Sequence, residues 1–107
     1  MKYLVIGNEG PGFFSSEEAI EMLENIVIPA FEELEELETE GALVGGVPVG
    51  ERAFAFIIEA ESHDDVDRTL RSMPIWNMLE WEVTPLLDFE SRAQQEREIL
   101  KDLKKKS

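Results

Sequence analysis

The 107-residue sequence contains no cysteine and only one histidine, His63. Without cysteine the chain can form neither a disulfide nor a thiolate nucleophile, and a single histidine makes a histidine-based catalytic triad hard to assemble. The sequence also lacks an apolar run of about 20 residues, the length of a membrane-spanning helix. Residues 1–7 have the pattern of a strand rather than of a signal peptide. We therefore expect a cytoplasmic protein.

Positive charge is scarce outside the C-terminal end. Residues 1–90 carry 4 Lys and Arg against 21 Asp and Glu, a net charge of −17, whereas residues 91–107 carry 6 against 3, a net charge of +3. An acidic body repels phosphate groups, so we expect neither nucleic acid nor a membrane as a partner. Lys101 and the lysines at 104–106 fall at the end of an expected helix, where they complement the helix dipole. We prefer this interpretation of the basic tail to that of an anchor.

The alternation of apolar and polar residues predicts four strands and three helices. Strands are expected at residues 2–8, 42–49, 52–60 and 79–86, and helices at residues 16–39, after Ser62, and at residues 89–105. The order βαββαβ followed by a helix predicts an α+β, ferredoxin-like fold, whose four-stranded antiparallel sheet has the order 4-1-3-2. Residues 1–88 would form this domain. Residues 89–107 would form a C-terminal helical arm that docks on another subunit.

Local signals mark the ends of the first helix. Ser15, followed by Glu18, is typical of a capping box, and Gly41 is placed to end the helix. Pro29 lies inside the helical pattern, where it removes a backbone donor and clashes with the carbonyl of Asn25. A kink or a break is therefore expected at this point.

Glycine and proline also shape the neighbouring segments. Pro48 cannot donate to a ladder, so the second strand should be an edge strand or a bulged one. Gly45 and Gly46 would let a ligand or, as we prefer, another chain approach the backbone. We expect the aromatic pair at 13–14 (Phe13 and Phe14) to fold onto the core or to cover the mouth of a pocket.

The two faces of the expected sheet differ in their surroundings. One face of the third strand carries Phe54, Phe56 and Ile58, which should pack on the helices. The other face of the sheet would carry four apolar side chains, those of Val5, Ala53, Ala55 and Ile57. This face is too apolar for water, so we expect a second copy of the sheet to cover it. The protein would then be a homodimer or a larger ring.

The segment from residue 54 to residue 83 resembles muconolactone isomerase and its relatives. It reads Phe-Ala-Phe-Ile-Ile-Glu-Ala, then a Ser-capped helix containing Thr69-Leu70, then Met-Pro-Ile-Trp at 73–76 and Leu-Glu-Trp-Glu-Val at 79–83. The family has an apolar residue, proline, an apolar residue and an aromatic at 73–76, and an acidic-apolar-Glu-Val strand at 80–83. The pair of residues 40–41, Glu-Gly, is also similar.

The resemblance implies a dimeric α/β barrel of the muconolactone isomerase type. Such a protein would act without a cofactor, as an isomerase or cyclase, on a lactone, an organic acid or a polyketide-like molecule in a barrel pocket. The second strand departs from the family, which has Trp, Arg and His where this chain reads Ala-Leu-Val-Gly-Gly-Val. The resemblance therefore predicts the fold more strongly than the reaction. No loop has the ligand spacing of a calcium site, so we expect no metal.

Two carboxylates, Glu59 and Glu82, are the candidates for catalysis. In a 4-1-3-2 sheet their strands flank the first strand, and alternation places both side chains away from the helices, beside Tyr3. In a closed barrel, burial would raise the pKa of such a carboxylate and let it move a proton next to a carbonyl group. Trp76 and Asn8 would line an opening and, with Tyr3, contact the ligand.

A simpler interpretation of these residues stays open. Because the chain has 24 acidic residues, the carboxylates can be partly exposed groups that pair with Arg52 or Arg71. The tryptophans can belong to the core, and His63 is expected at the surface. The alternative function is a non-catalytic module for ligand binding or oligomeric assembly. A cavity with a buried carboxylate would favour the enzyme, and a filled interior would favour the module.

Overall fold

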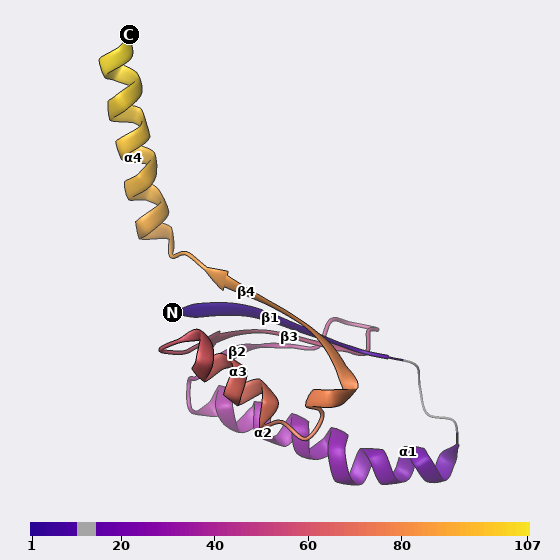
Figure 1. Cartoon of the computed structure of the whole chain (residues 1–107). Helices are drawn as coiled ribbons and strands as arrows, with labels where there is room; N and C mark the ends of the chain where they lie inside the picture. Colours follow the sequence, from indigo (N-terminus) through magenta and orange to yellow (C-terminus); the bar gives the residue numbers. More distant parts are fainter. Residues whose placement is uncertain (11–14) are drawn as a thin grey trace.

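The computed structural model describes residues 1–10 and 15–107, so Phe13 and Phe14 lie outside the described residues. The elements follow in the order β1 (Lys2–Glu9), α1 (Ser16–Met22), η1 (Leu23–Val27), α2 (Ile28–Thr39), β2 (Leu43–Gly46), β3 (Ala53–Glu59), α3 (His63–Arg71), η2 (Trp76–Met78), β4 (Leu79–Leu86) and α4 (Phe89–Lys106). The strands form one antiparallel sheet in the order β2-β3-β1-β4. The α+β, ferredoxin-like fold predicted from the sequence is confirmed, and α1, α2 and α3 lie on one side of the sheet (Figure 1).

The long helical segment of residues 16–39 contains a π turn instead of a break. In this turn, η1, the backbone N–H of Ile28 bonds to the carbonyl of Leu23. Pro29 follows directly, and in α geometry its ring would clash with the carbonyl of Asn25. A π turn widens the helix, so it accommodates the proline without ending the helix.

The caps predicted at Ser15 and Ser62 are confirmed, and Asp88 caps α4. The hydroxyls of Ser15 and Ser62 each accept a hydrogen bond from a backbone N–H at 3.1 Å, and the carboxylate of Asp88 accepts one from Ser91 at 2.7 Å. Gly41 has a φ of 81° and ends α2, and the next residue donates back to the carbonyl of Leu37 at 2.9 Å. This is the pattern of a Schellman motif. It needs a left-handed residue, which glycine supplies.

The strand register decides which side chains form the core. Tyr3 and Val5 lie opposite Ile58 and Phe56, and directly paired residues point to the same face. The expectation that Val5 lies on the open face is therefore wrong, since Val5 is fully buried under the helices. The helices complete this core with a set of buried side chains, those of Val27, Ala30, Val66, Leu70, Met73 and Ile75.

The face without helices is called the open face here. In the part of the chain that the structure describes, its central apolar side chains are those of Leu4, Ile6, Ala55 and Ile57, all half-buried. Ala53 lies on the same face and is buried. Val44 on the edge strand is 64% exposed. The open face is thus apolar at its centre, as the sequence predicted.

The edge strand β2 is shorter than the predicted 42–49 because the segment containing Pro48 leaves the ladder. Gly45 lies very close to its neighbour, and a Cβ atom built there would be 2.2 Å from the carbonyl oxygen of Ala55. The segment that approaches Gly45 is therefore β3 of the same chain.

The final helix, α4, projects away from the sheet beyond the end of β4 (Figure 1). Leu87 and Asp88 alone separate it from β4, and the whole molecule measures 70 × 27 × 23 Å. Phe89 is 94% exposed, and Leu100 and Leu103 are also exposed. Within residues 1–10 and 15–107, no helix is long and apolar enough to cross a membrane.

Candidate functional site

A tyrosine and a histidine from distant parts of the chain meet on the helix side of the sheet. The Oη atom of Tyr3 lies 2.7 Å from Nδ1 of His63. Their rings pack edge to face, with centroids 5.5 Å apart. Tyr3 is only 2% exposed, whereas His63 lies at the surface as predicted. The pair thus joins a buried phenol to an imidazole that solvent and ligands can reach.

This pair lies at the wall of a cavity of about 330 Å³. The cavity is lined by two residues from β4, one from β1 and four from α3: Val83, Pro85, Tyr3, His63, Val66, Asp67 and Leu70. The register places Tyr3 opposite Pro85 of β4, so the two residues lie side by side on the face of the sheet that the helices cover. A mostly apolar cavity of this size with a few polar groups is typical of a small-molecule site.

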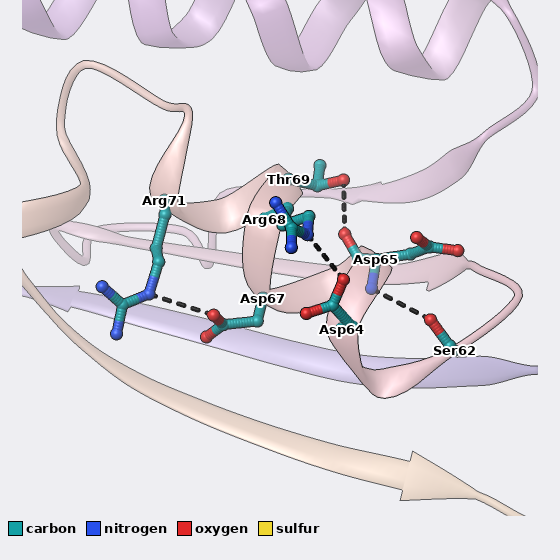
Figure 2. Close-up of polar contacts among 7 residues, drawn as sticks. All are labelled: Ser62, Asp64, Asp65, Asp67, Arg68, Thr69 and Arg71. Atoms are coloured by element: carbon teal, nitrogen blue, oxygen red, sulfur yellow. Dashed lines mark hydrogen bonds and ion pairs between the residues drawn. The ribbon is translucent and has the colours of Figure 1, made fainter.

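The position of the imidazole is fixed by the way α3 begins. Ser62 caps the helix by accepting from the backbone N–H of Asp65, so His63 is the first helical residue. Figure 2 shows the ion pairs along α3, in which Arg68 contacts Asp64 and Arg71 contacts Asp67 at 3.0 Å. These i,i+4 pairs support the helix that carries the imidazole.

The two predicted catalytic carboxylates lie on the open face, but they are not close to each other. Glu59 lies opposite Lys2 and Glu82 lies opposite Ile6, four residues further along β1. At about 3.4 Å per residue this separates them by about 14 Å along the strand direction. Both are exposed, and Glu59 accepts a hydrogen bond from the N-terminal ammonium group at 3.2 Å. A single chain therefore does not bring them together as a pair.

The three predicted ligand contacts are divided between the two faces. Asn8 is exposed on the open face, opposite Ala53. Trp76 lies on the helix side, half-buried, with the guanidinium of Arg71 4.6 Å from its ring centroid. Tyr3 also lies on the helix side, so the expectation that it sits beside the carboxylates is wrong. The reason is its register with Ile58, a core residue.

The arginines considered as partners for the carboxylates make other ion pairs. Arg52 contacts Glu9 at 3.0 Å, and Arg71 contacts Asp67. Within the described residues, no group of three or more His, Asp or Glu side chains could hold a metal ion.

Comparison with known proteins places the chain in a family. The model of the muconolactone delta-isomerase family matches residues 17–92. The chain belongs to this family. Its fold is similar to that of the crystal structure of muconolactone isomerase at 3.3 Å resolution, with a TM-score of 0.65 and 19% sequence identity. The similarity covers 82% of this chain and 90% of that one. No curated protein sequence matches the chain.

The family match stops near the start of α4, so most of this helix lies outside the matched residues. The residues that line the cavity beside Tyr3 and His63 all fall within the matched residues 17–92, except for Tyr3 in β1.

Sequence reasoning missed the role of His63 as the partner of Tyr3. Each residue stands alone in the sequence as the single histidine and the single tyrosine. The register between the first and third strands could have indicated this contact. It places Tyr3 opposite Ile58, which lies five residues before His63 in the sequence. Alternation within one strand cannot supply that register.

A second cavity, of about 240 Å³, lies at the opposite edge of the sheet, between α2 and the edge strand β2. Its wall on α2 consists of Phe31, Leu34, Glu35 and Glu38. The ring of Phe31 packs edge to face on Phe54, with centroids 4.8 Å apart. Among the described residues, the lining of this cavity has carboxylates at its rim but neither histidine nor tyrosine, so it holds no pair like that of Tyr3 and His63.

Proposed function

We propose that the chain is a cofactor-independent, isomerase-like protein that acts on a small uncharged molecule in the cavity beside Tyr3 and His63. The observation that carries this proposal is the 2.7 Å hydrogen bond between Tyr3 Oη and His63 Nδ1 at the wall of that cavity. Membership of the muconolactone delta-isomerase family supports it. An acid and a base held within hydrogen-bond reach are what proton transfer requires.

The pair has the groups that an isomerisation by proton transfer needs. When Nδ1–H of His63 donates to Tyr3 Oη, Nε2 is left as an acceptor and the phenolic O–H is left as a donor. Nε2 removes a proton from a carbon next to a carbonyl group. The electrons of that C–H bond pass into an enolate, whose oxygen accepts a hydrogen bond from Tyr3. In a substrate with a C=C bond next to that carbon, the enolate extends over the double bond. Return of the proton from Nε2 to the far carbon then shifts the double bond, gives the isomer and restores both side chains.

The lining of the cavity favours an uncharged substrate. Asp67 is the acidic residue in the lining, and it forms an ion pair with Arg71. Because Arg71 is engaged in this pair, it does not offer its charge to a substrate carboxylate. The net charge of −14 also repels anions. A lactone or ketone with an apolar body suits the side chains of Val66, Leu70 and Val83.

Hydrogen–deuterium exchange into a ligand tests the proposal. The full-length protein in D₂O is mixed with unsaturated lactones, ketones or carboxylic acids, and NMR follows the protons next to the carbonyl group. We expect exchange in uncharged ligands, slowed about 100-fold or more in His63→Gln and in Tyr3→Phe. Glu82→Gln is the matched control, because this exposed open-face carboxylate is outside the cavity.

The outcomes separate the two candidate sites and the two candidate functions. Loss of exchange in Glu82→Gln but not in His63→Gln would move the reaction to the open face. A ligand that raises the Tm of the wild type but not of His63→Gln, without exchange, would indicate binding without turnover. Absence of both exchange and stabilisation would contradict the proposed site.

We also propose that two copies pack open face against open face to form a homodimer. Ile6 and Ile57 are half-buried at the centre of this face, and such apolar patches usually lie in contacts. The dimer would enclose Glu59, Glu82 and Asn8, so any role of these residues depends on it. Ile57→Glu should then lower the mass measured by sedimentation equilibrium, and Ile20→Glu on α1 is the control. A wild-type protein that sediments as a 12.2 kDa monomer would contradict the dimer.

A further inference from the structure

The C-terminal helix α4 carries an apolar stripe that is exposed to solvent. Ile99, Leu100 and Leu103 are 51%, 52% and 59% exposed. At 3.6 residues per turn they fall on one side of the helix, in line with Phe89. Figure 1 shows the helix directed away from the sheet and from the other helices. Among the described residues, α4 therefore has little packing in its own chain to stabilise it.

Basic side chains border this stripe. By helical periodicity Arg97, Lys101 and Lys104 lie along one side of the stripe, next to Leu100. Residues 91–107 carry a net charge of +3. From residue 99 onward the helix therefore presents an apolar centre with a basic margin, whereas Arg92 and Glu96, which form an ion pair at 3.8 Å, interrupt the stripe between this part and Phe89.

The cavity between α2 and β2 has the complementary character. Phe31 and Leu34 form its apolar side, and Glu35 and Glu38 form its acidic rim. These four positions follow the i, i+3, i+4, i+7 spacing of one helix face. Residues 16–39, which form the helical segment behind this rim, contain nine Glu and neither Lys nor Arg.

The cavity between α2 and β2 is also open to a partner. Phe31 is 39% exposed, and the neighbouring Val47 is 46% exposed. Gly45 and Gly46 line the cavity without side chains. An incoming helix can therefore approach the edge strand closely.

The helix and the cavity lie at opposite edges of the sheet. α4 follows β4, the outer strand on one side, whereas the cavity is at β2, the outer strand on the other side. Leu87 and Asp88 alone connect β4 to α4, and α4 runs away from the sheet (Figure 1). The α4 helix therefore cannot reach the cavity of its own chain.

We propose that α4 of one copy docks in the α2–β2 cavity of a second copy. Leu100 and Leu103 enter the apolar part beside Phe31, and Lys101 and Lys104 face the carboxylates of Glu35 and Glu38. The helix that docks and the cavity that receives it are different parts of the molecule, so the contact is heterologous. Such contacts repeat from copy to copy and give closed rings or open chains. This contact is separate from the open-face dimer.

Sedimentation velocity of the full-length chain at low salt tests the docking. Leu100→Gln combined with Leu103→Gln should weaken the α4-dependent association at least tenfold. Charge reversal in α4 (Lys101→Glu with Lys104→Glu) and charge reversal in the cavity (Glu35→Lys with Glu38→Lys) should each weaken it. Mixing the two charge-reversed proteins should restore it, since the reversed helix then matches the reversed cavity and the unreversed helix matches the unreversed cavity. Glu98→Gln, on the side of α4 away from the stripe, is the matched control.

Three results would overturn the proposal. The first is a wild-type assembly that the double Leu→Gln variant does not alter. The second is weakening by the α4 variants but not by the cavity variants, which would place α4 elsewhere, such as on the open face. The third is a mixture of charge-reversed proteins that fails to associate. Circular dichroism checks that each variant keeps its helix content, and Ile57→Glu removes any contribution of the open-face dimer.

Discussion

Gly45 in β2 lies so close to β3 that a Cβ atom at this residue would be 2.2 Å from the carbonyl oxygen of Ala55. The neighbouring Gly46 has nothing within 4 Å of the same position. Two adjacent glycines in one strand thus have different structural roles. One allows the edge strand to pair, and the other points to open space.

The first prediction follows from this difference. Gly45→Ala should lower the free energy of unfolding by about 1–3 kcal/mol, because the new methyl group must displace backbone atoms of β3. Gly46→Ala is the matched control and should leave stability nearly unchanged. Urea denaturation of both variants measures the difference. Equal stability of the two variants would contradict the close packing of β2 on β3.

The second prediction concerns the hydrogen bond between the tryptophans. The indole N–H of Trp81 donates to the backbone carbonyl of Trp76 at 3.0 Å, which ties the start of β4 to η2. Trp81→Phe removes the donor and should cost about 1–2 kcal/mol in the free energy of unfolding. Trp76→Phe keeps the bond because the acceptor is a main-chain atom, so its cost should be smaller. A larger loss in Trp76→Phe would show that the ring of Trp76 matters more than this bond.

The third prediction concerns Glu33, whose pKa lies above its ordinary value of 4.5. Burial raises the pKa most, the hydroxyl of Ser72 opposes this by a hydrogen bond, and the charge of Glu36 adds to the rise. The folded state therefore holds the proton more tightly than the unfolded state. As pH rises from 4.5 through the raised pKa, Glu33 makes the fold progressively less stable.

Glu33→Gln should accordingly raise the Tm at pH 7, and the gain should shrink as the pH approaches 4.5. Thermal melts across this pH range measure it. Glu32→Gln removes the same charge from an exposed neighbour and is the control for net charge. A gain that is equal in both variants would assign the effect to net charge instead of to the position of Glu33.

The fourth prediction concerns the cap of α4. The backbone N–H and the side chain of Ser91 hydrogen-bond to the Asp88 carboxylate, which lowers its pKa below the ordinary 3.8. The ionised cap therefore stabilises the helix fully above pH 3.8, and this contribution disappears as the pH falls through the lowered pKa.

Asp88→Ala should reduce the helix content measured by far-ultraviolet circular dichroism at neutral pH, because α4 has few other contacts to hold its first turn. The difference from wild type should fade in strong acid. Gln94→Ala, in the middle of α4, serves as the control. Unchanged helix content in Asp88→Ala would mean that other contacts fix the start of α4.

Local chemistry explains what could be predicted from the sequence. The bounds of β4 and the caps at Ser15, Ser62 and Asp88 depend on residues within one turn or one strand. Short-range sequence patterns are therefore enough to predict them. The order of the strands follows from the order of the elements.

The faces of β1 could not be predicted in the same way. Tyr3 and Val5 alternate with Leu4 and Ile6, and both sets are apolar. Only the pairing of Val5 with Phe56, about fifty residues away in sequence, decides which set lies under the helices.

The candidate site was hidden for the same reason. Alternation placed Glu59 and Glu82 on the open face, and the register confirms this. Alternation within each strand could not predict how far apart the two carboxylates lie. The contact of Tyr3 with His63 joins the first strand to the start of α3. A partnership of this kind depends on tertiary packing, so neither residue indicates it alone.

The π turn at residues 23–27 sets the phase of the whole first helical segment. Each residue in a helix turns the chain by about 100°, so a turn with one extra residue offsets everything before it by that angle. Deletion of one residue within η1 would rotate α1 by about a quarter turn relative to α2. Acidic side chains such as Glu18 and Glu21 would then change their direction relative to the sheet. The number of residues between Ser15 and Pro29 therefore matters to the fold as much as their identities do. Insertions and deletions in this segment should disturb the structure more than substitutions do.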